Sequence, residues 1–142
     1  MTRIVLLLLL LLSALPATAQ TAPRQLPVDK AYSAISISGF DVQKMGLTMT
    51  IQRDAKGDTF KGFGNAGCNG WSAGVILRED QIDFTEIVTT RKFCGEPRMK
   101  AEEAFLTSLK SARRWRTDGD RLIIEGDAAR LLLKASTPPA KR

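Results

Sequence analysis

The chain has 142 residues, of which 44% are hydrophobic and 25% charged, and a formal net charge of +6, which suits one globular domain with a basic surface. It contains no histidine, which excludes Ser-His-Asp and Cys-His catalysis, and its two cysteines are too few for the usual zinc sites. We therefore expect no catalytic residues, no metal site and no cofactor.

Residues 1–19 have the features of a signal peptide. Arg3 supplies a positive charge, residues 4–12 are apolar, and Ala17-Thr18-Ala19 fits a cleavage site. The apolar run is about half as long as a membrane helix needs, and no cysteine near the cleavage site can carry a lipid. We expect a bacterial protein that is periplasmic or secreted, soluble after cleavage, and not membrane-spanning.

Alternation of apolar and polar residues predicts a mainly β domain over residues 31–136, between a flexible leader at 20–30 and a basic tail at 137–142. In the first stretch, Ile35 and Ile37 are expected to share a face. Strands are predicted at 31–38, 47–52, 59–63, 73–77, 81–85, 113–116, 122–124 and 130–135. We expect a small antiparallel barrel-like meander of about seven or eight strands. The alternative is an open α+β sheet.

One helix is predicted from about residue 97 to residue 111. Pro97 suits the first turn of a helix, where its missing N–H costs nothing. The apolar stripe of this helix consists of Ala101, Phe105, Leu106 and Leu109. Glu102 and Glu103 are predicted to be solvated on its surface, as are Glu79 and Asp80 in the turn between two strands, so neither pair indicates an acid/base site.

Cys68 and Cys94 are the only cysteines, and in an exported protein they predict one disulfide. Closing this loop would stabilise the fold by about 3–4 kcal/mol in the chain-entropy model. The alternatives are two buried free thiols or a redox pair, although the Cys-x-x-Cys spacing of redox pairs is absent.

Three residues near the cysteines are candidate binding residues: Asn69, Trp71 and Arg91. Asn69 is followed by Gly70, which favours a turn with positive φ. Trp71 is predicted to be partly buried. Arg91 is expected to donate to carbonyls of the Cys68 loop, or else to bind an anion. A basic patch is a further possibility, made by Arg91, Lys92 and Arg98 together with Arg113, Arg114 and Arg116.

At these residues the chain resembles the META/HslJ-like domain family. The matching pieces are Gly67-Cys68-Asn69, Gly74, Thr90-Arg91, Cys94, Met99, Glu102, Phe105-Leu106, Leu109, Gly119, Leu122 and Ile124. The resemblance covers roughly residues 30–136. The chain departs from the family at 31–38, which lacks the tryptophan often found in the first strand, and it has no lipidation site. The resemblance implies a barrel-like domain with one helix, exported, linked in some members to heat shock, novobiocin resistance or virulence-related secretion, and without established catalytic residues.

We expect a non-enzymatic exported envelope protein that acts as a binding or stress-tolerance module. Its partner is an unknown protein or envelope component; weak contact with anionic surfaces is expected from its charge, nucleic acid is not expected, and the protein is expected to be a monomer. The alternatives are a secreted inhibitor of a hydrolase and a lipocalin-like small-molecule binder.

Overall fold

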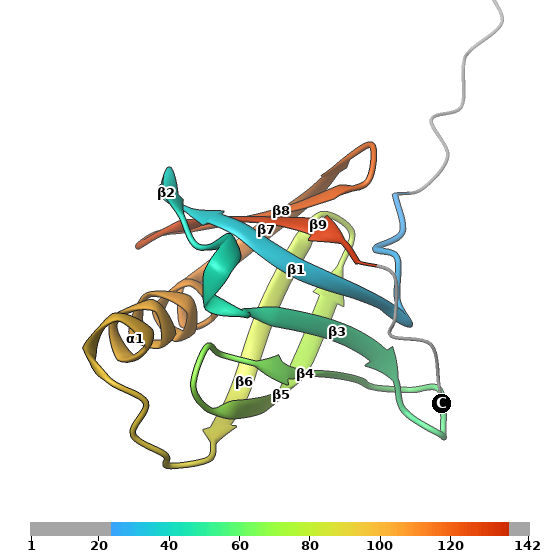
Figure 1. Ribbon diagram of the computed structural model, residues 1–142. Coiled ribbons are helices and arrows are strands. Elements are labelled where there is room, and N and C mark those ends of the chain that lie inside the picture. The colour runs from blue at the N-terminus through green and yellow to red at the C-terminus, as the bar shows by residue number, and fades with distance from the viewer. Residues whose placement is uncertain (1–23, 137–142) are drawn as a thin grey trace, which may run out of the picture.

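Eight antiparallel strands close into a barrel in the computed structural model, which describes residues 24–136 (Figure 1). The predicted signal peptide and basic tail lie outside these residues. Closure occurs because β1 (Lys30–Ile37) pairs with β3 (Thr48–Arg53) along one edge and with β9 (Arg130–Ala135) along the other. The mainly β prediction is confirmed, and the open-sheet alternative is wrong because the first and last strands pair.

The remaining strands follow one another around the wall. They are β4 (Phe60–Asn65), β5 (Gly70–Arg78), β6 (Gln81–Thr89), β7 (Ala112–Asp118) and β8 (Arg121–Gly126). An additional short strand, β2 (Phe40–Asp41), pairs only with β1 and leads into the 3₁₀ turn η1 (Gln43–Met45). Between β6 and β7 the register contains one residue pair, Gln81 opposite Arg114, so this is the weakest seam of the barrel.

Alternate side chains of the strands fill the barrel, as expected for a small closed sheet. In β1, however, the inward residues are Tyr32, Ala34 and Ile37, and Ile35 is only partly buried. The prediction that Ile35 and Ile37 share a face is wrong. A register shift between Ala34 and Ser36 inserts an extra residue opposite β9, which moves the side chains after it to the other face.

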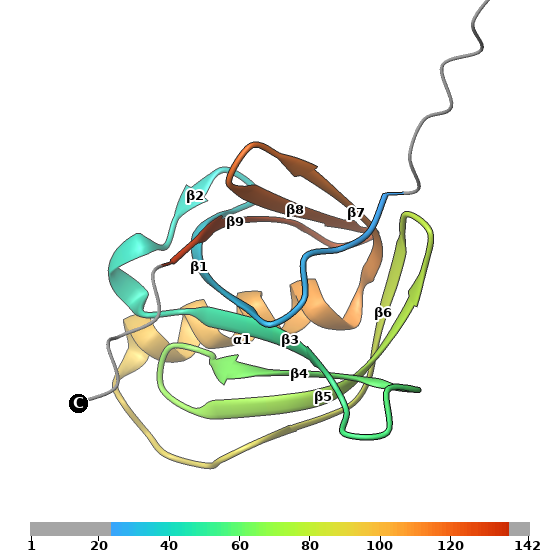
Figure 2. The ribbon, with the colours of Figure 1, turned by 90° about the vertical axis from the view of Figure 1, so that its right-hand side faces the viewer.

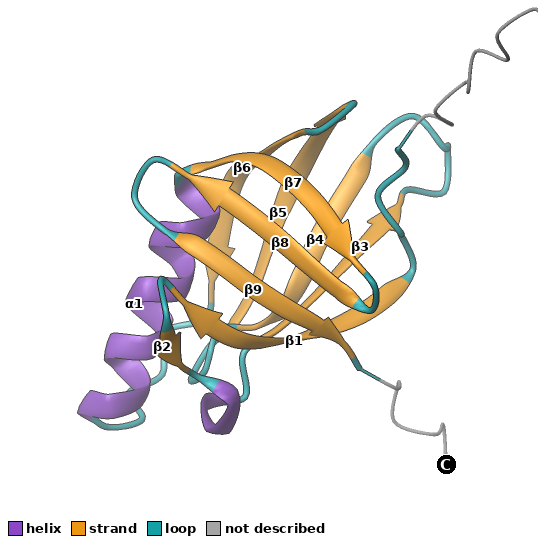
Figure 3. Cartoon of the chain, turned by 90° about the horizontal axis from the view of Figure 1, so that it is seen from above, coloured by secondary structure: helices purple, strands orange, loops and turns teal. Residues whose placement is uncertain are grey.

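The α-helix found in residues 24–136, α1 (Glu96–Lys110), lies across one end of the barrel (Figures 2 and 3). Its apolar stripe faces the interior, where Phe105 and Leu109 are fully buried. The helix ends at Lys110 with Ser111 as its C-cap, near the predicted position. It therefore closes this end of the barrel with side chains.

The segment 24–29 crosses the opposite opening before it enters β1 (Figure 2). Sequence patterning assigns it to a flexible leader, yet Leu26 is 7% exposed and belongs to the core. The amide of Asp29 also donates to the carbonyl of Ile51 at 2.7 Å. The last residues before β1 thus form part of the domain, because their apolar side chains cover the open end of the barrel.

Candidate functional site

Cys68 and Cys94 form a disulfide, with Cα atoms 5.7 Å apart, as the sequence predicts. Cys68 lies just before β5 and is buried, whereas Cys94 lies just before α1 and is exposed. The bond therefore encloses the β5–β6 hairpin and ties its start to the beginning of the helix. The free-thiol alternative is wrong, since both sulfur atoms are paired. A redox pair in its oxidised form would also be a disulfide, so that alternative is not tested by the pairing.

Asn69 is the centre of a polar network beside the disulfide. Its side chain is 2% exposed. Its Oδ1 accepts hydrogen bonds from the Lys92 amide at 2.6 Å and from Thr90 Oγ1 at 2.8 Å, and its Nδ2 donates to the Lys92 carbonyl at 3.2 Å. The prediction of a positive-φ turn at Asn69 is wrong. The amide side chain instead pairs with the backbone of a segment more than 20 residues away.

Glu102 reaches this network from α1. Its carboxylate accepts from the Asn69 backbone amide at 2.7 Å and from Asn69 Nδ2 at 2.8 Å, and the residue is 7% exposed. The prediction that Glu102 is solvated is wrong. Helical periodicity could have predicted this burial, because Glu102 lies three residues before Phe105 and one after Ala101, on the buried side of the helix.

Trp71 is also more buried than predicted, at 4% exposed. Its ring makes edge contacts with Phe105 and Phe84, at centroid distances of 5.7 and 6.1 Å. Its indole N–H donates to the Thr48 carbonyl at 3.1 Å. Trp71 is therefore a core residue and does not offer a contact surface to a partner.

Arg91 is exposed, and within the described chain its side chain makes no hydrogen bond or ion pair, so the expected bond to the Cys68 loop is absent. Arg98 makes that bond instead, with Nη1 donating to the Gly67 carbonyl at 3.1 Å. Of the three predicted binding residues, Asn69 and Trp71 are internal and only Arg91 faces solvent.

The segment 90–95, hereafter the disulfide loop, presents Phe93 to solvent. This side chain is 85% exposed, the largest exposure among the large hydrophobic residues described. On one side of Phe93, both backbone polar groups of Lys92 are bonded to Asn69; on the other side, Cys94 is covalently bonded to Cys68. Phe93 is thus an exposed aromatic side chain on a backbone that is fixed at both neighbours.

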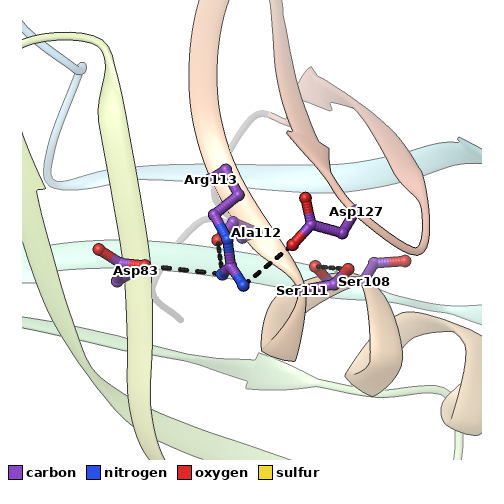
Figure 4. Close-up of polar contacts among 6 residues, drawn as sticks. All are labelled: Asp83, Ser108, Ser111, Ala112, Arg113 and Asp127. Carbon is purple, nitrogen blue, oxygen red and sulfur yellow. Dashed lines mark hydrogen bonds and ion pairs between the residues drawn. The ribbon is translucent and has the colours of Figure 1, made fainter.

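The arginines of β7 do not join the basic residues of the disulfide loop. Arg114 pairs with Gln81 at the start of β6, whereas the loop follows Thr89 at its end, a separation of about 26 Å along the strand. Arg113 lies between Asp83 at 3.8 Å and Asp127 at 3.0 Å (Figure 4). The possible single basic patch is therefore not formed: Arg113 pairs with Asp83 of β6 and with Asp127 after β8, and Arg116 pairs with Glu125 of β8.

The carboxylates nearest the disulfide do not form a converging pair. Glu102 is fully engaged with Asn69, and the neighbouring Glu103 is exposed, so these carboxylates do not converge. Among residues 24–136 no group of three or more histidine, cysteine or carboxylate side chains is placed to hold a metal ion. In the same part of the chain, no helix combines the length and apolar character that a bilayer-crossing segment requires.

Comparison with known proteins gives one family and two solved structures. The model of the META domain family matches residues 24–138. The NMR structure of a protein from Burkholderia xenovorans is similar with a TM-score of 0.59 at 17% identity, covering 87% of this chain and 98% of that one. A second NMR structure is similar with a TM-score of 0.55 at 19% identity, covering 74% and 87%. These structures support the fold alone. No curated protein matches the sequence.

Proposed function

Because the chain belongs to the META domain family, we propose that it is a non-enzymatic binding module that acts in the cell envelope after export and contributes there to stress tolerance. The disulfide loop is its contact element. The loop is held in place by Cys68, Asn69 and Glu102, which do not touch the partner.

The observation that carries the proposal is the presentation of Phe93. Covering a large exposed aromatic side chain with a partner's surface removes its apolar area from water, which favours binding. Here its backbone neighbours are fixed by the Asn69 amide and by the disulfide. A contact residue that is already ordered loses little conformational entropy on binding, which favours affinity.

Site-specific photo-crosslinking tests this proposal. A benzophenone amino acid at position 93, in full-length protein expressed in bacterial cells, should give an envelope adduct identifiable by mass spectrometry. Position 40 is the matched control, because Phe40 is 78% exposed and lies on β2, away from the loop. Equal adduct patterns at both positions would contradict the proposal.

Export is tested by intact mass on protein recovered from the periplasm or medium. We expect a chain beginning at Gln20 and lighter by two hydrogens than the reduced form, with no free thiol. A chain that keeps residues 1–19 would contradict the export part of the proposal.

A second candidate function is inhibition of a secreted hydrolase, favoured by the same rigid loop and by the exposed Glu79-Asp80 turn between β5 and β6. It predicts inhibition of a protease or lysozyme that is lost when Phe93 or this turn is altered. The lipocalin-like alternative is not favoured, because side chains such as Met49, Trp71 and Phe105 fill the barrel interior.

A further inference from the structure

Basic residues flank Phe93 in the sequence of the disulfide loop and the helix that follows it. Arg91 and Lys92 precede it directly, and Arg98 follows in the first turns of α1; all three are exposed. Within the described residues none of them forms an ion pair, whereas Lys100, Arg113, Arg116, Arg130 and Lys134 all do. No acidic residue occurs between Glu86 and Glu96, and Glu96 is paired with Lys100 at 2.6 Å. The loop and the start of α1 therefore carry exposed basic residues without ion-pair partners on both sides of Phe93 in the sequence.

The loop is also convex. In Figure 1 it projects below the strands between the end of β6 and the start of α1. A protein partner of standard size needs a contact area of about 800 Å² on each side, which a six-residue loop supplies only together with neighbouring surface. A fluid surface that can deform around a small tip needs no such matching area.

We propose that the disulfide loop docks on an anionic lipid bilayer, with Phe93 inserted at the level of the head groups and Arg91, Lys92 and Arg98 bound to lipid phosphates. This inference rests on the proposed function, in which the same loop is the contact element. Charge complementarity selects the lipid: each Lys or Arg near an anionic surface raises the partition coefficient about fivefold. Arg and Lys can keep their charged ends at the phosphates while their stems lie along the apolar layer.

Vesicle co-sedimentation of the mature protein, residues 20–142, tests the inference. Vesicles of phosphatidylglycerol and phosphatidylethanolamine should bind the protein, and vesicles of phosphatidylcholine should bind it at least tenfold less. Raising the salt to about 0.5 M should weaken binding to the anionic vesicles, because exposed charges are screened.

Variants locate the contact. Arg91→Gln/Lys92→Gln should lower the partition coefficient about 25-fold, the product of two fivefold charge effects, and Phe93→Ala should lower it several-fold. The matched controls are Arg114→Gln/Arg121→Gln, which removes the same charge from exposed, unpaired positions on β7 and β8, and Phe40→Ala. All four alter exposed side chains, and circular dichroism verifies that each is folded.

Equal binding to neutral and anionic vesicles, or equal losses in loop and control variants, would overturn the lipid assignment. If vesicles do not bind while position 93 still gives a specific protein adduct in cells, the bilayer inference is wrong and the proposed function stands. If neither vesicle binding nor a specific adduct is found, both are wrong.

Discussion

At one end of the barrel, α1 lies over the interior and is joined to the strands by directional bonds, whereas at the other end only the segment 24–29 crosses the opening. The helix end combines Phe105, the Asn69–Glu102 pair and the disulfide. The leader end has Leu26 in the core, partly buried Val28 against it, and one backbone bond from Asp29. The two ends differ in how they are closed. At the helix end, directional bonds fix the positions of the segments, whereas at the end crossed by residues 24–29 apolar contacts mainly exclude water.

This contrast explains why the candidate contact residue lies at the helix end. Hydrogen bonds to buried groups are directional and costly to break, so they hold a segment in one conformation. Apolar contact stabilises without specifying direction. The disulfide loop shares its fixing bonds with the helix closure, so the rigidity of the loop and the stability of that end depend on the same residues.

Of the substitutions considered, Asn69→Ala should lower the free energy of unfolding the most. It removes four side-chain hydrogen bonds and leaves the buried Glu102 carboxylate with one donor, which should lower the free energy of unfolding by about 4 kcal/mol. Urea denaturation measures this. Asn65→Ala is the control, since the exposed Asn65 side chain accepts a single bond from the Gly67 amide, and it should cost about 1 kcal/mol. Similar losses in both variants would mean that the Asn69 network contributes no more to stability than one exposed hydrogen bond.

Replacing both cysteines, as Cys68→Ser/Cys94→Ser, should cost about 3.5 kcal/mol through the loop that the bond closes. It should also raise amide hydrogen exchange in residues 90–95, because one of the two fixed neighbours of Phe93 is released. The native protein in reductant should behave in the same way. Unchanged exchange in this loop would show that the Asn69 bonds fix it alone.

At the leader end, Leu26→Ala should cost about 2 kcal/mol, near the lower limit for a buried leucine because the site borders solvent. Chemical denaturation measures the change, and Gln25→Ala, at an exposed neighbour, should be neutral. Hydrogen exchange in the disulfide loop should not change. An increase there would mean that the two ends are coupled.

The smallest expected effect is a loss of stability at alkaline pH. Burial raises the pKa of Tyr32 above its ordinary value of 10.0. The unfolded chain therefore releases this proton more readily, so the contribution of Tyr32 to stability is complete below about pH 10 and is lost as the pH rises through the higher folded value. Tyr32→Phe should lose less stability than the native protein between about pH 8 and pH 11. An equal loss in both would assign the alkaline change to other groups.

Sequence patterning predicts most of the fold and little of the site. Alternation and turn residues locate the hairpins, and the stripe around Phe105 locates the helix, because these signals are local. The inward face of β1 is missed because its register shift depends on pairing with β9. The roles of Asn69 and Glu102 are missed because their bonds join segments far apart in sequence. The signal for Glu102 is present in the helical period, but its charge favours a surface assignment.

Closure of the barrel has a consequence for the order in which the chain can fold. Tyr32 in the first strand pairs with Ala135 in the last, so the wall cannot be completed until almost the entire chain is available. A chain that emerges from its N-terminus, whether from a ribosome or from a membrane channel, can form the β5–β6 hairpin early, since its contacts are local. One edge of the first strand can pair with β3 early, but its other edge must wait for the ninth strand. Until then the polypeptide remains an incomplete sheet with unpaired edges, and it becomes a closed cylinder only when its final strand arrives.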